Sequence, residues 1–265
     1  SIEIQFFKAE ELAQKAETDY SRNILVKGER GEILDRNFNK LATSTRAYSV
    51  TAAPDIINKP AETAAKLATV LNIDPNAVTK KLSTRKKFTW IAKRIPPALA
   101  EKVRQLNLVG IHLEKDFKRI YPHRETAAQV IGFTGSNAKG LEGLEFKLNR
   151  TLEGKTFKTR LRHDGNGGIL AIDKGTRDQL KGASVMLTLD KKIQYLSEQS
   201  LEKAVRENHA RSGIAVVMRP ATGELLAVAH YPQFNPNHFA GQSRYTLRNR
   251  SVSDPFEPGS VIKIF

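Results

Sequence analysis

The sequence predicts an α+β fold in which an antiparallel sheet is flanked by helices. Apolar residues recur at helical spacing over 60–72 and 96–107. Apolar and polar residues alternate over 88–93, as they do in a strand with one buried face. Two short apolar runs, 213–219 and 224–230, are joined by a Pro-Ala-Thr-Gly turn, which predicts an antiparallel hairpin.

The first predicted element is an amphipathic helix over 2–20, where apolar side chains recur at steps of four and three. A helix that faces the core and a helix that binds a partner both fit this stripe. Residues 30–51 then predict strand, turn and strand, because 35–39 supply turn-forming side chains before an alternating run at 47–51.

Prolines at first-turn positions mark the starts of three further helices. Pro60 opens a helix to about residue 72. Asp74 and Pro75 start a shorter helix that ends near Leu82. Pro96-Pro97 opens the last helix, to about residue 107. Together these elements predict a helical subdomain of about 55–110.

A basic run over 80–94 holds seven Lys or Arg residues and no acid, with Phe88 and Trp90 among them. Basic groups that neutralise phosphates and aromatic rings that stack on bases are typical of nucleic-acid binding. The same residues alternate as in a strand that buries Phe88, Trp90 and Ala92. We expect the strand, with the aromatic face inside, and no nucleic-acid partner.

The middle of the chain predicts shorter elements. Residues 110–113 and 119–122 are expected to be two extended pieces, and 127–133 a short helix that runs into a strand. The glycines of 140–145 fit neither a dinucleotide fingerprint nor a phosphate loop, since Leu-Glu stands where the latter needs Lys and a hydroxyl. An Asp-Gly-Asn-Gly-Gly run at 164–168 predicts a hairpin turn.

A shift in composition after Lys181-Gly182 predicts two modules, 1–183 and 184–265. The second opens with a strand over 185–189 and with Asp190 as the N-cap of a helix. We expect one face of that helix to be lined by Ile193, Leu196, Leu201, Ala204 and Val205.

Composition excludes several kinds of site. The sequence carries 43 Lys and Arg against 28 Asp and Glu, a net charge of +15, which suits nucleic acid, anionic lipid or an acidic polymer, or simply a solvated basic surface. It has no cysteine, so disulfides, thiolate zinc sites and cysteine nucleophiles are excluded. The histidines show no paired metal-binding spacing, and we expect neither a metal nor a cofactor. No apolar run approaches the length of a membrane helix, about 20 residues.

The candidate catalytic residues are Ser260 and Lys263. If Pro258-Gly259 closes a loop and a helix starts at Ser260, both side chains leave one face, so that a nucleophile lies beside a base. The helix start also offers free N–H groups for an oxyanion, including that of Ser260. Three other Ser-x-x-Lys matches lack the Glu-Pro-Gly lead-in: Ser83/Lys86, Ser136/Lys139 and Ser200/Lys203.

The segment before Ser260 resembles the active-site serine segment of class B penicillin-binding proteins and is most similar to the division-specific branch. This segment contains Arg248, Asn249, Arg250, Asp254, Glu257 and Gly259. Three motifs at 187–194, 222–227 and 234–237 are similar to the start of the family's transpeptidase domain.

Two further motifs resemble the non-catalytic module of the same family. The run at 30–37 contributes Arg30, Gly31, Asp35 and Arg36, of which the three charged residues are expected to form a structural ion-pair network rather than a reaction centre. The Gly-x-x-Gly-x-Glu box contributes Gly140, Gly143 and Glu145, and the resemblance implies that it packs between modules.

The resemblance implies an elongated non-catalytic pedestal or dimerisation module followed by the start of a D,D-transpeptidase domain. Ser260 would attack peptidoglycan stem peptides, which a lipid-linked precursor supplies, and β-lactams would acylate it. The implied partners are divisome membrane proteins and a glycosyltransferase. The implied location is the periplasm, with a bacterial inner-membrane anchor upstream of Ser1.

The sequence lacks the Ser-x-Asn and Lys-Thr-Gly boxes that the family carries downstream of the nucleophile. We therefore expect a fragment of a longer protein, with the fragment inactive by itself. As such a fragment, its alternative role is a non-catalytic scaffold for divisome partners. An uncovered apolar face and an unpaired sheet edge are expected over 184–265.

Overall fold

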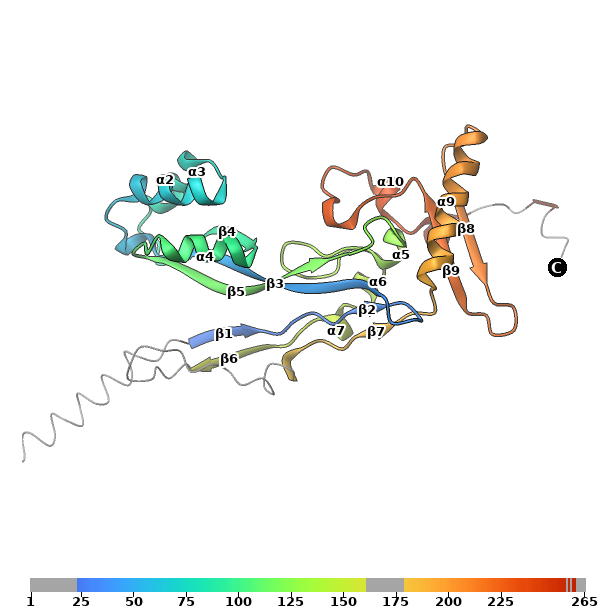
Figure 1. The fold of residues 1–265 in the computed structure, drawn as a ribbon, viewed down its shortest axis with the longest axis horizontal. Coiled ribbons are helices and arrows are strands. Elements are labelled where there is room, and N and C mark those ends of the chain that lie inside the picture. The colour runs from blue at the N-terminus through green and yellow to red at the C-terminus, as the bar shows by residue number, and fades with distance from the viewer. Residues whose placement is uncertain (1–22, 161–178, 256, 258, 261–265) are drawn as a thin grey trace, which may run out of the picture.

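The computed structural model describes residues 23–160, 179–255, 257 and 259–260. These residues form an elongated molecule, with a helical lobe at one end and a helix packed on a β-hairpin at the other (Figure 1). The mixed helix and strand content confirms the predicted α+β class. The predicted helix over 2–20 and the predicted turn at 164–168 lie outside the described residues.

The longest strand, β3 (Lys40–Ala52), organises the first half of the structure. β5 (Ile111–Ile120) pairs antiparallel along residues 43–52 of β3, and β4 (Thr89–Ile95) pairs antiparallel with its last residues. β2 (Ile33–Leu34) pairs with the start of β3. A parallel pairing then joins β2 to β7 (Val185–Met186). A separate ribbon joins β1 (Asn23–Lys27) to β6 (Thr156–Arg160).

The three helices predicted from Pro60, Asp74-Pro75 and Pro96-Pro97 are present in the helical lobe. η1 (Pro54–Ile56), α2 (Pro60–Leu71), α3 (Pro75–Leu82) and α4 (Pro97–Gln105) each carry proline in the first turn, where no N–H is needed. The Asp74 carboxylate caps α3 by accepting from the first free N–H groups. The lobe has its own core, built from Val50, Leu67, Leu71, Val78, Leu82, Ile91 and Val103.

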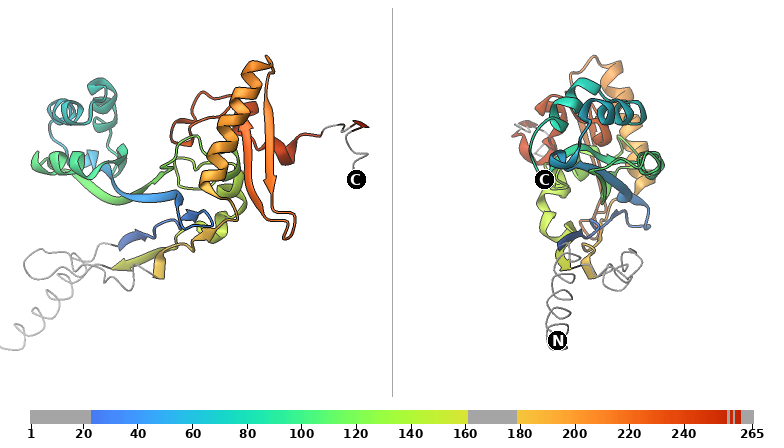
Figure 2. Two further views of the ribbon diagram at one scale, coloured as in Figure 1. Left: turned by 45° about the vertical axis from the view of Figure 1, so that its right-hand side comes forward. Right: turned by 90° about the vertical axis from the view of Figure 1, so that its left-hand side faces the viewer.

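The remaining elements surround a second core. They are α5 (Ala128–Ile131), α6 (Gly143–Lys147), α7 (Asn149–Leu152), α9 (Lys191–Glu207), β8 (Gly213–Met218), β9 (Leu225–Tyr231), η2 (Pro236–His238), α10 (Arg244–Leu247) and α11 (Arg250–Ser253). This core joins Ile33, Ile131 and Phe133 to Leu189 and Phe234, so it spans the predicted module boundary at 183. The α9 helix lies along the β8–β9 hairpin (Figure 2).

The predicted burial of β4 is wrong. Ile91 and Ile95 are the buried residues of this strand, whereas Phe88 is 48% exposed and Trp90 is half-buried. The reason is that α2, α3 and α4 cover the face with the isoleucines and bury them in the lobe core. The aromatic rings lie on the other face and pack on each other edge to face, 5.2 Å between centroids.

Three further expectations need correction. The two extended pieces at 110–122 are one continuous strand, β5, because β3 is long enough to pair with all of it. The strand predicted over 185–189 is only two residues long. The buried face of α9 contains Gln194, Glu198 and Val205, while Leu196 is exposed, because the helix packs through amide and carboxyl groups on β9 and the α5 segment.

Candidate functional site

Ser260 is exposed and follows a sharp turn of the backbone. Gly259 adopts a left-handed conformation (φ 57°), which glycine takes without strain. Ser260 lies in the short helical turn that follows. Glu257 is also exposed, whereas Lys263 lies outside the described residues. The structure therefore presents the hydroxyl to solvent, as a nucleophile requires.

The segment before Ser260 is held by one carboxylate. Asp254 lies 2.6 Å from an Arg248 nitrogen and 3.6 Å from Nε of Arg250. Asn249 caps α11, because its side-chain oxygen accepts from the Ser251 N–H (3.2 Å). The four motif residues Arg248, Asn249, Arg250 and Asp254 are thus brought together in a compact turn.

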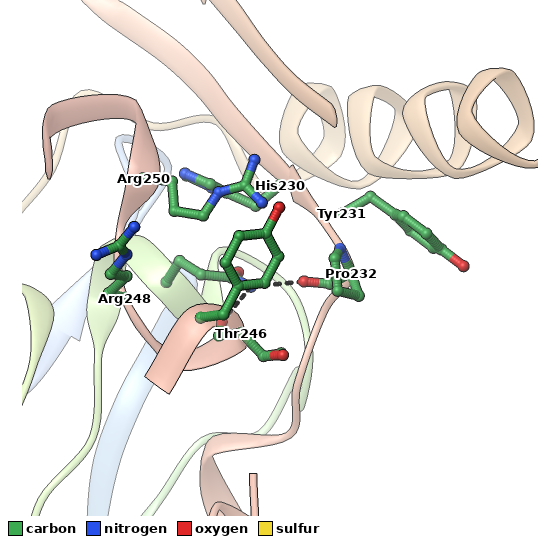
Figure 3. A pocket seen from close by; sticks show the side chains of 8 residues that line it. His230, Tyr231, Pro232, Thr246, Arg248 and Arg250 are labelled. Atoms are coloured by element: carbon green, nitrogen blue, oxygen red, sulfur yellow. Dashed lines mark hydrogen bonds between the residues drawn. The ribbon is translucent and has the colours of Figure 1, made fainter. Parts of the chain in front are cut away.

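A pocket lies beside this turn (Figure 3). Arg250 stacks over the Tyr245 ring, 4.4 Å from its centroid. Gln129, from α5, donates to the carbonyls of Pro232 (2.9 Å) and Thr246 (3.1 Å), and so ties α5 to the other side of the pocket. The pocket's walls and floor are formed by Gln129, His230, Tyr231, Pro232, Tyr245, Thr246, Arg248 and Arg250.

His230 is the buried titratable group of this pocket. Burial lowers its pKa, and the nearby positive charge of Arg250 lowers it further. Its Nε2 accepts from the Ser251 N–H at 3.4 Å, which requires a neutral ring with the proton on the other nitrogen. At neutral pH His230 therefore supports the turn as an uncharged hydrogen-bond acceptor.

Arg30 and Glu145 form a buried charge cluster together with Arg119. Nε of Arg30 lies 2.6 Å from one Glu145 oxygen, and Nε of Arg119 lies 2.7 Å from the other. All three side chains are at most 4% exposed. The Tyr121 hydroxyl also donates to Glu145 (3.3 Å). Burial, followed by the negative charge of Glu145, raises the pKa of Tyr121, which keeps the phenol protonated.

The glycine box explains how Glu145 reaches this cluster. Gly143 starts α6 with a positive φ of 59°. A Cβ on Gly140 would lie 1.9 Å from the Glu145 carbonyl oxygen, so only glycine allows the loop to fold back on the helix. That carbonyl accepts from Arg30 at 2.8 Å. The box therefore positions both the backbone and the side chain of Glu145 around Arg30.

The ion-pair network expected for Arg30, Asp35 and Arg36 does not form among these residues. The Asp35 carboxylate accepts instead from the backbone N–H groups of Asn37, Asn39 and Lys191. These hydrogen bonds compensate for the burial of the carboxylate without a cation beside it. Burial acts to raise the pKa of Asp35, but the hydrogen bond from the Asn39 side-chain amide, together with these N–H groups, holds it below the usual value. Arg36 lies 3.6 Å from Glu224, across the module boundary. Gly31 contributes its carbonyl, which accepts from Arg119 at 2.7 Å.

The sequence did not predict which backbone groups Gln194, Glu198 and Asn237 contact, and the contacts of Glu198 and Asn237 join the two modules. Gln194 pairs its amide with both backbone groups of Val228, at 2.8 and 3.0 Å. Glu198 accepts from the Ala127 N–H (2.8 Å). Asn237 pairs its amide with both backbone groups of Tyr121. Gln194 and Asn237 fall within motifs at 187–194 and 234–237, but the motifs do not reveal which backbone they contact.

Two absences hold for the part of the chain that the structure describes. No three His, Cys, Asp or Glu side chains there are grouped in a way that could hold a metal ion. None of the helices in that part has the length and apolar character needed to cross a bilayer.

Known protein families account for most of the chain. Residues 25–187 match the penicillin-binding protein dimerisation domain, and residues 213–265 match the penicillin-binding protein transpeptidase domain. The solved peptidoglycan synthetase from Bifidobacterium adolescentis is similar in structure, with a TM-score of 0.62 and 26% identity over 92% of this chain and 50% of that one. A complex between penicillin-binding protein PBP2 and MreC from Helicobacter pylori shares the fold, with a TM-score of 0.64 and 22% identity over 88% of this chain and 47% of that one.

Curated relatives match this chain over part of their own length. The probable peptidoglycan D,D-transpeptidase PbpC of Pseudomonas aeruginosa is 33% identical over 100% of this chain and 47% of its own length. Peptidoglycan D,D-transpeptidase FtsI of Escherichia coli is 33% identical over 90% of this chain and 42% of its own length. Stage V sporulation protein D of Bacillus subtilis is 34% identical over 98% of this chain and 41% of its own length. The chain thus spans less than half the length of these relatives. Because the dimerisation domain alone covers more than half of the chain and the transpeptidase match follows it, the chain belongs to the class B penicillin-binding proteins.

Proposed function

We propose that the natural protein is a serine-type peptidoglycan D,D-transpeptidase of cell division, with Ser260 as its nucleophile. The observation that carries this proposal is the exposed Ser260, which follows the left-handed Gly259 and the turn held by Asp254, within a matched transpeptidase domain. The names of the curated relatives FtsI and PbpC support the reaction class.

The proposed chemistry is acyl transfer in two steps. Ser260 Oγ attacks the carbonyl between the two terminal D-alanines of a stem peptide and gives its proton to Lys263, while the Ser260 N–H holds the oxyanion. The bond to the last D-alanine breaks, and its amine leaves with that proton. An amine on a neighbouring stem then attacks the serine ester, forms the cross-link and releases Ser260. For this role Lys263 must be neutral, which requires burial or nearby positive charge to lower its pKa.

We place the boundary between the pedestal and the transpeptidase part at 183/184. The natural protein is proposed to be anchored in the inner (cytoplasmic) membrane, with both modules in the periplasm and with a lipid-linked precursor supplying the stem peptides. A second role is proposed for the pedestal, as a docking module for divisome membrane proteins and a glycosyltransferase. Support for it comes from the dimerisation-domain match and from the similar fold in the PBP2–MreC complex.

Labelling with a fluorescent penicillin tests the enzymatic proposal in a version of the protein that contains the complete transpeptidase domain. We expect a covalent adduct that mass spectrometry maps to Ser260 and that Ser260→Ala abolishes. Ser200→Ala is the matched control, because Ser200 and Lys203 have the same spacing on the exposed surface of α9. Labelling that survives Ser260→Ala, or that is lost in Ser200→Ala, would contradict the assignment.

A further inference from the structure

The helical lobe ends in a tip at which three strands of the sheet meet. Ala52, the last residue of β3, pairs with Thr89 at the start of β4 and with Ile111 at the start of β5. The segments just beyond these strand ends therefore lie together. We call the segments 53–56, 84–88 and 108–110 the lobe tip.

Backbone hydrogen bonds fix the three segments of the lobe tip against one another. The Asp55 N–H donates to the Lys86 carbonyl at 3.3 Å. The Ala53 N–H donates to the Gly110 carbonyl at 2.8 Å. Since both bonds involve main-chain groups, the tip is a built surface of the fold rather than a set of independent loops.

Each segment of the lobe tip exposes one large apolar side chain. Ile56 is 49% exposed, Phe88 is 48% exposed and Val109 is 71% exposed. Phe88 rests edge to face on Trp90, whose ring also lies 5.0 Å from the Lys93 ammonium. Apolar groups from three different segments thus gather at one exposed end of the lobe.

The charge of the lobe tip is strongly positive. Arg85, Lys86 and Lys87 are all exposed and adjacent in the chain, and Asp55 is the single acid in the three segments. Exposed basic residues also flank the tip, at Lys80, Lys81 and Lys93. Basic groups beside exposed aromatic and aliphatic side chains are the combination that binds the interfacial region of an anionic membrane.

We propose that the lobe tip docks on the surface of a lipid bilayer that carries anionic headgroups. Phe88, Ile56 and Val109 would enter the headgroup region, while the lysines and Arg85 contact lipid phosphates. The tip lies at the same end of the elongated molecule as β1, where the described chain begins, and α9 and the β8–β9 hairpin form the other end (Figure 1). In the cell this docking depends on the membrane anchor that we propose above. Docking of the lobe tip would hold the pedestal at a fixed tilt to the membrane.

The sequence supplies a reporter for this contact, because Trp90 is its single tryptophan. We would add vesicles of equal parts phosphatidylglycerol and phosphatidylcholine to the chain and record both co-sedimentation and tryptophan emission. Binding with a blue shift is expected on these vesicles, and raised salt or pure phosphatidylcholine should abolish both. The double variant Lys86→Ser with Lys87→Ser should bind the vesicles about 25-fold more weakly, because each basic residue contributes roughly fivefold to the affinity.

The matched control is Lys139→Ser with Lys147→Ser, which removes the same charge from exposed positions on the pedestal. It should bind as the unchanged chain does, and circular dichroism checks that every variant is folded. Equal losses in the two double variants would overturn the proposal in favour of diffuse charge. Vesicle binding without a change in Trp90 emission would overturn it as well, and so would tip-dependent binding of poly-glutamate or single-stranded DNA but not of vesicles. Penicillin labelling is independent of these readouts, so failure of either proposal is recognised separately.

Discussion

At the scale of single residues, the structure depends on buried charges that the sequence presents as ordinary polar positions. Glu145 is fully buried and satisfies Arg30 and Arg119 at once. Glu198 is buried without a cation and relies on the Ala127 N–H and the Gln194 amide. The first carboxylate is compensated by opposite charge and the second by hydrogen bonds, so the two should respond differently to substitution and to pH.

Glu145→Gln should lower the free energy of unfolding by about 3–5 kcal/mol, because it leaves two buried guanidinium groups without a counter-charge. Urea denaturation followed by circular dichroism measures this loss. Glu114→Gln, at an exposed position of β5, is the control and should change stability by less than about 0.5 kcal/mol. A loss from Glu145→Gln as small as that of the control would show that the cluster does not stabilise the pedestal.

We expect Glu198 to make the free energy of unfolding depend on pH. Burial raises its pKa to about 7 from an ordinary value of 4.5. The folded state therefore keeps a proton that the unfolded state releases, so the stability contribution is present below pH 4.5 and is lost as pH rises through 7. The loss is on the order of 3 kcal/mol, because a pKa difference of one corresponds to about 1.4 kcal/mol.

Thermal unfolding between about pH 5 and about pH 8 tests this prediction, because most of the loss falls within this range. Glu198→Gln keeps the oxygen that accepts from Ala127 but cannot ionise, so its melting temperature should depend less on pH than that of the unchanged chain. Identical pH profiles for the two proteins would contradict the assignment of the titration to Glu198.

At the scale of elements, hydrogen bonds at helix ends and strand edges decide how the second module is assembled. The N-terminus of α9 follows one edge of β9, because the Asp190 N–H donates to Leu226 and the Gln194 amide pairs with Val228. The Asp190 carboxylate meanwhile caps α9. The short α11 is held in a similar way. Asn249 caps the helix, and Asp254 forms ion pairs with Arg248 and Arg250.

Asp254→Asn should slow acylation of Ser260 by penicillin, since it removes the charge that holds Arg248 and Arg250 in the preceding turn. We expect a reduction of about 10- to 100-fold, the size of effect that a small misplacement of a nucleophile produces. Stopped labelling reactions on the protein with a complete transpeptidase domain give the rate constant. Glu207→Gln, at the exposed end of α9, is the control and should leave the rate unchanged; equal rates for all three proteins would exclude a positioning role for Asp254.

At the scale of the whole molecule, the described residues form two hydrophobic cores that differ in how much of the chain they join. One core is confined to the helical lobe, while the other joins the pedestal to the segment after residue 184. Pedestal and transpeptidase part therefore share apolar packing, with Glu198 and Asn237 bonding across the same contact. The β8 strand, by contrast, exposes Val216 and Met218. In the described residues it pairs with β9 alone.

The local elements and the family can be inferred from the sequence alone. Proline and Asp74 fixed the helix starts of the lobe, Pro220 to Gly223 fixed the hairpin, and Asp190 fixed the start of α9, because capping and turn chemistry act within a few residues. The order of spaced motifs indicated the class B family. These signals are local, so they need no knowledge of what each element packs against.

The buried face of an element and the pairing of its charges, by contrast, depend on contacts between distant segments. Ile91 rather than Trp90 is buried in β4 because helices distant in sequence cover that face. Arg30 pairs with Glu145, 115 residues away, and Asp35 with the backbone of Lys191. Periodicity shows that a strand has two faces and composition shows that charges exist, but burial and pairing are set by long-range packing, which no local pattern encodes.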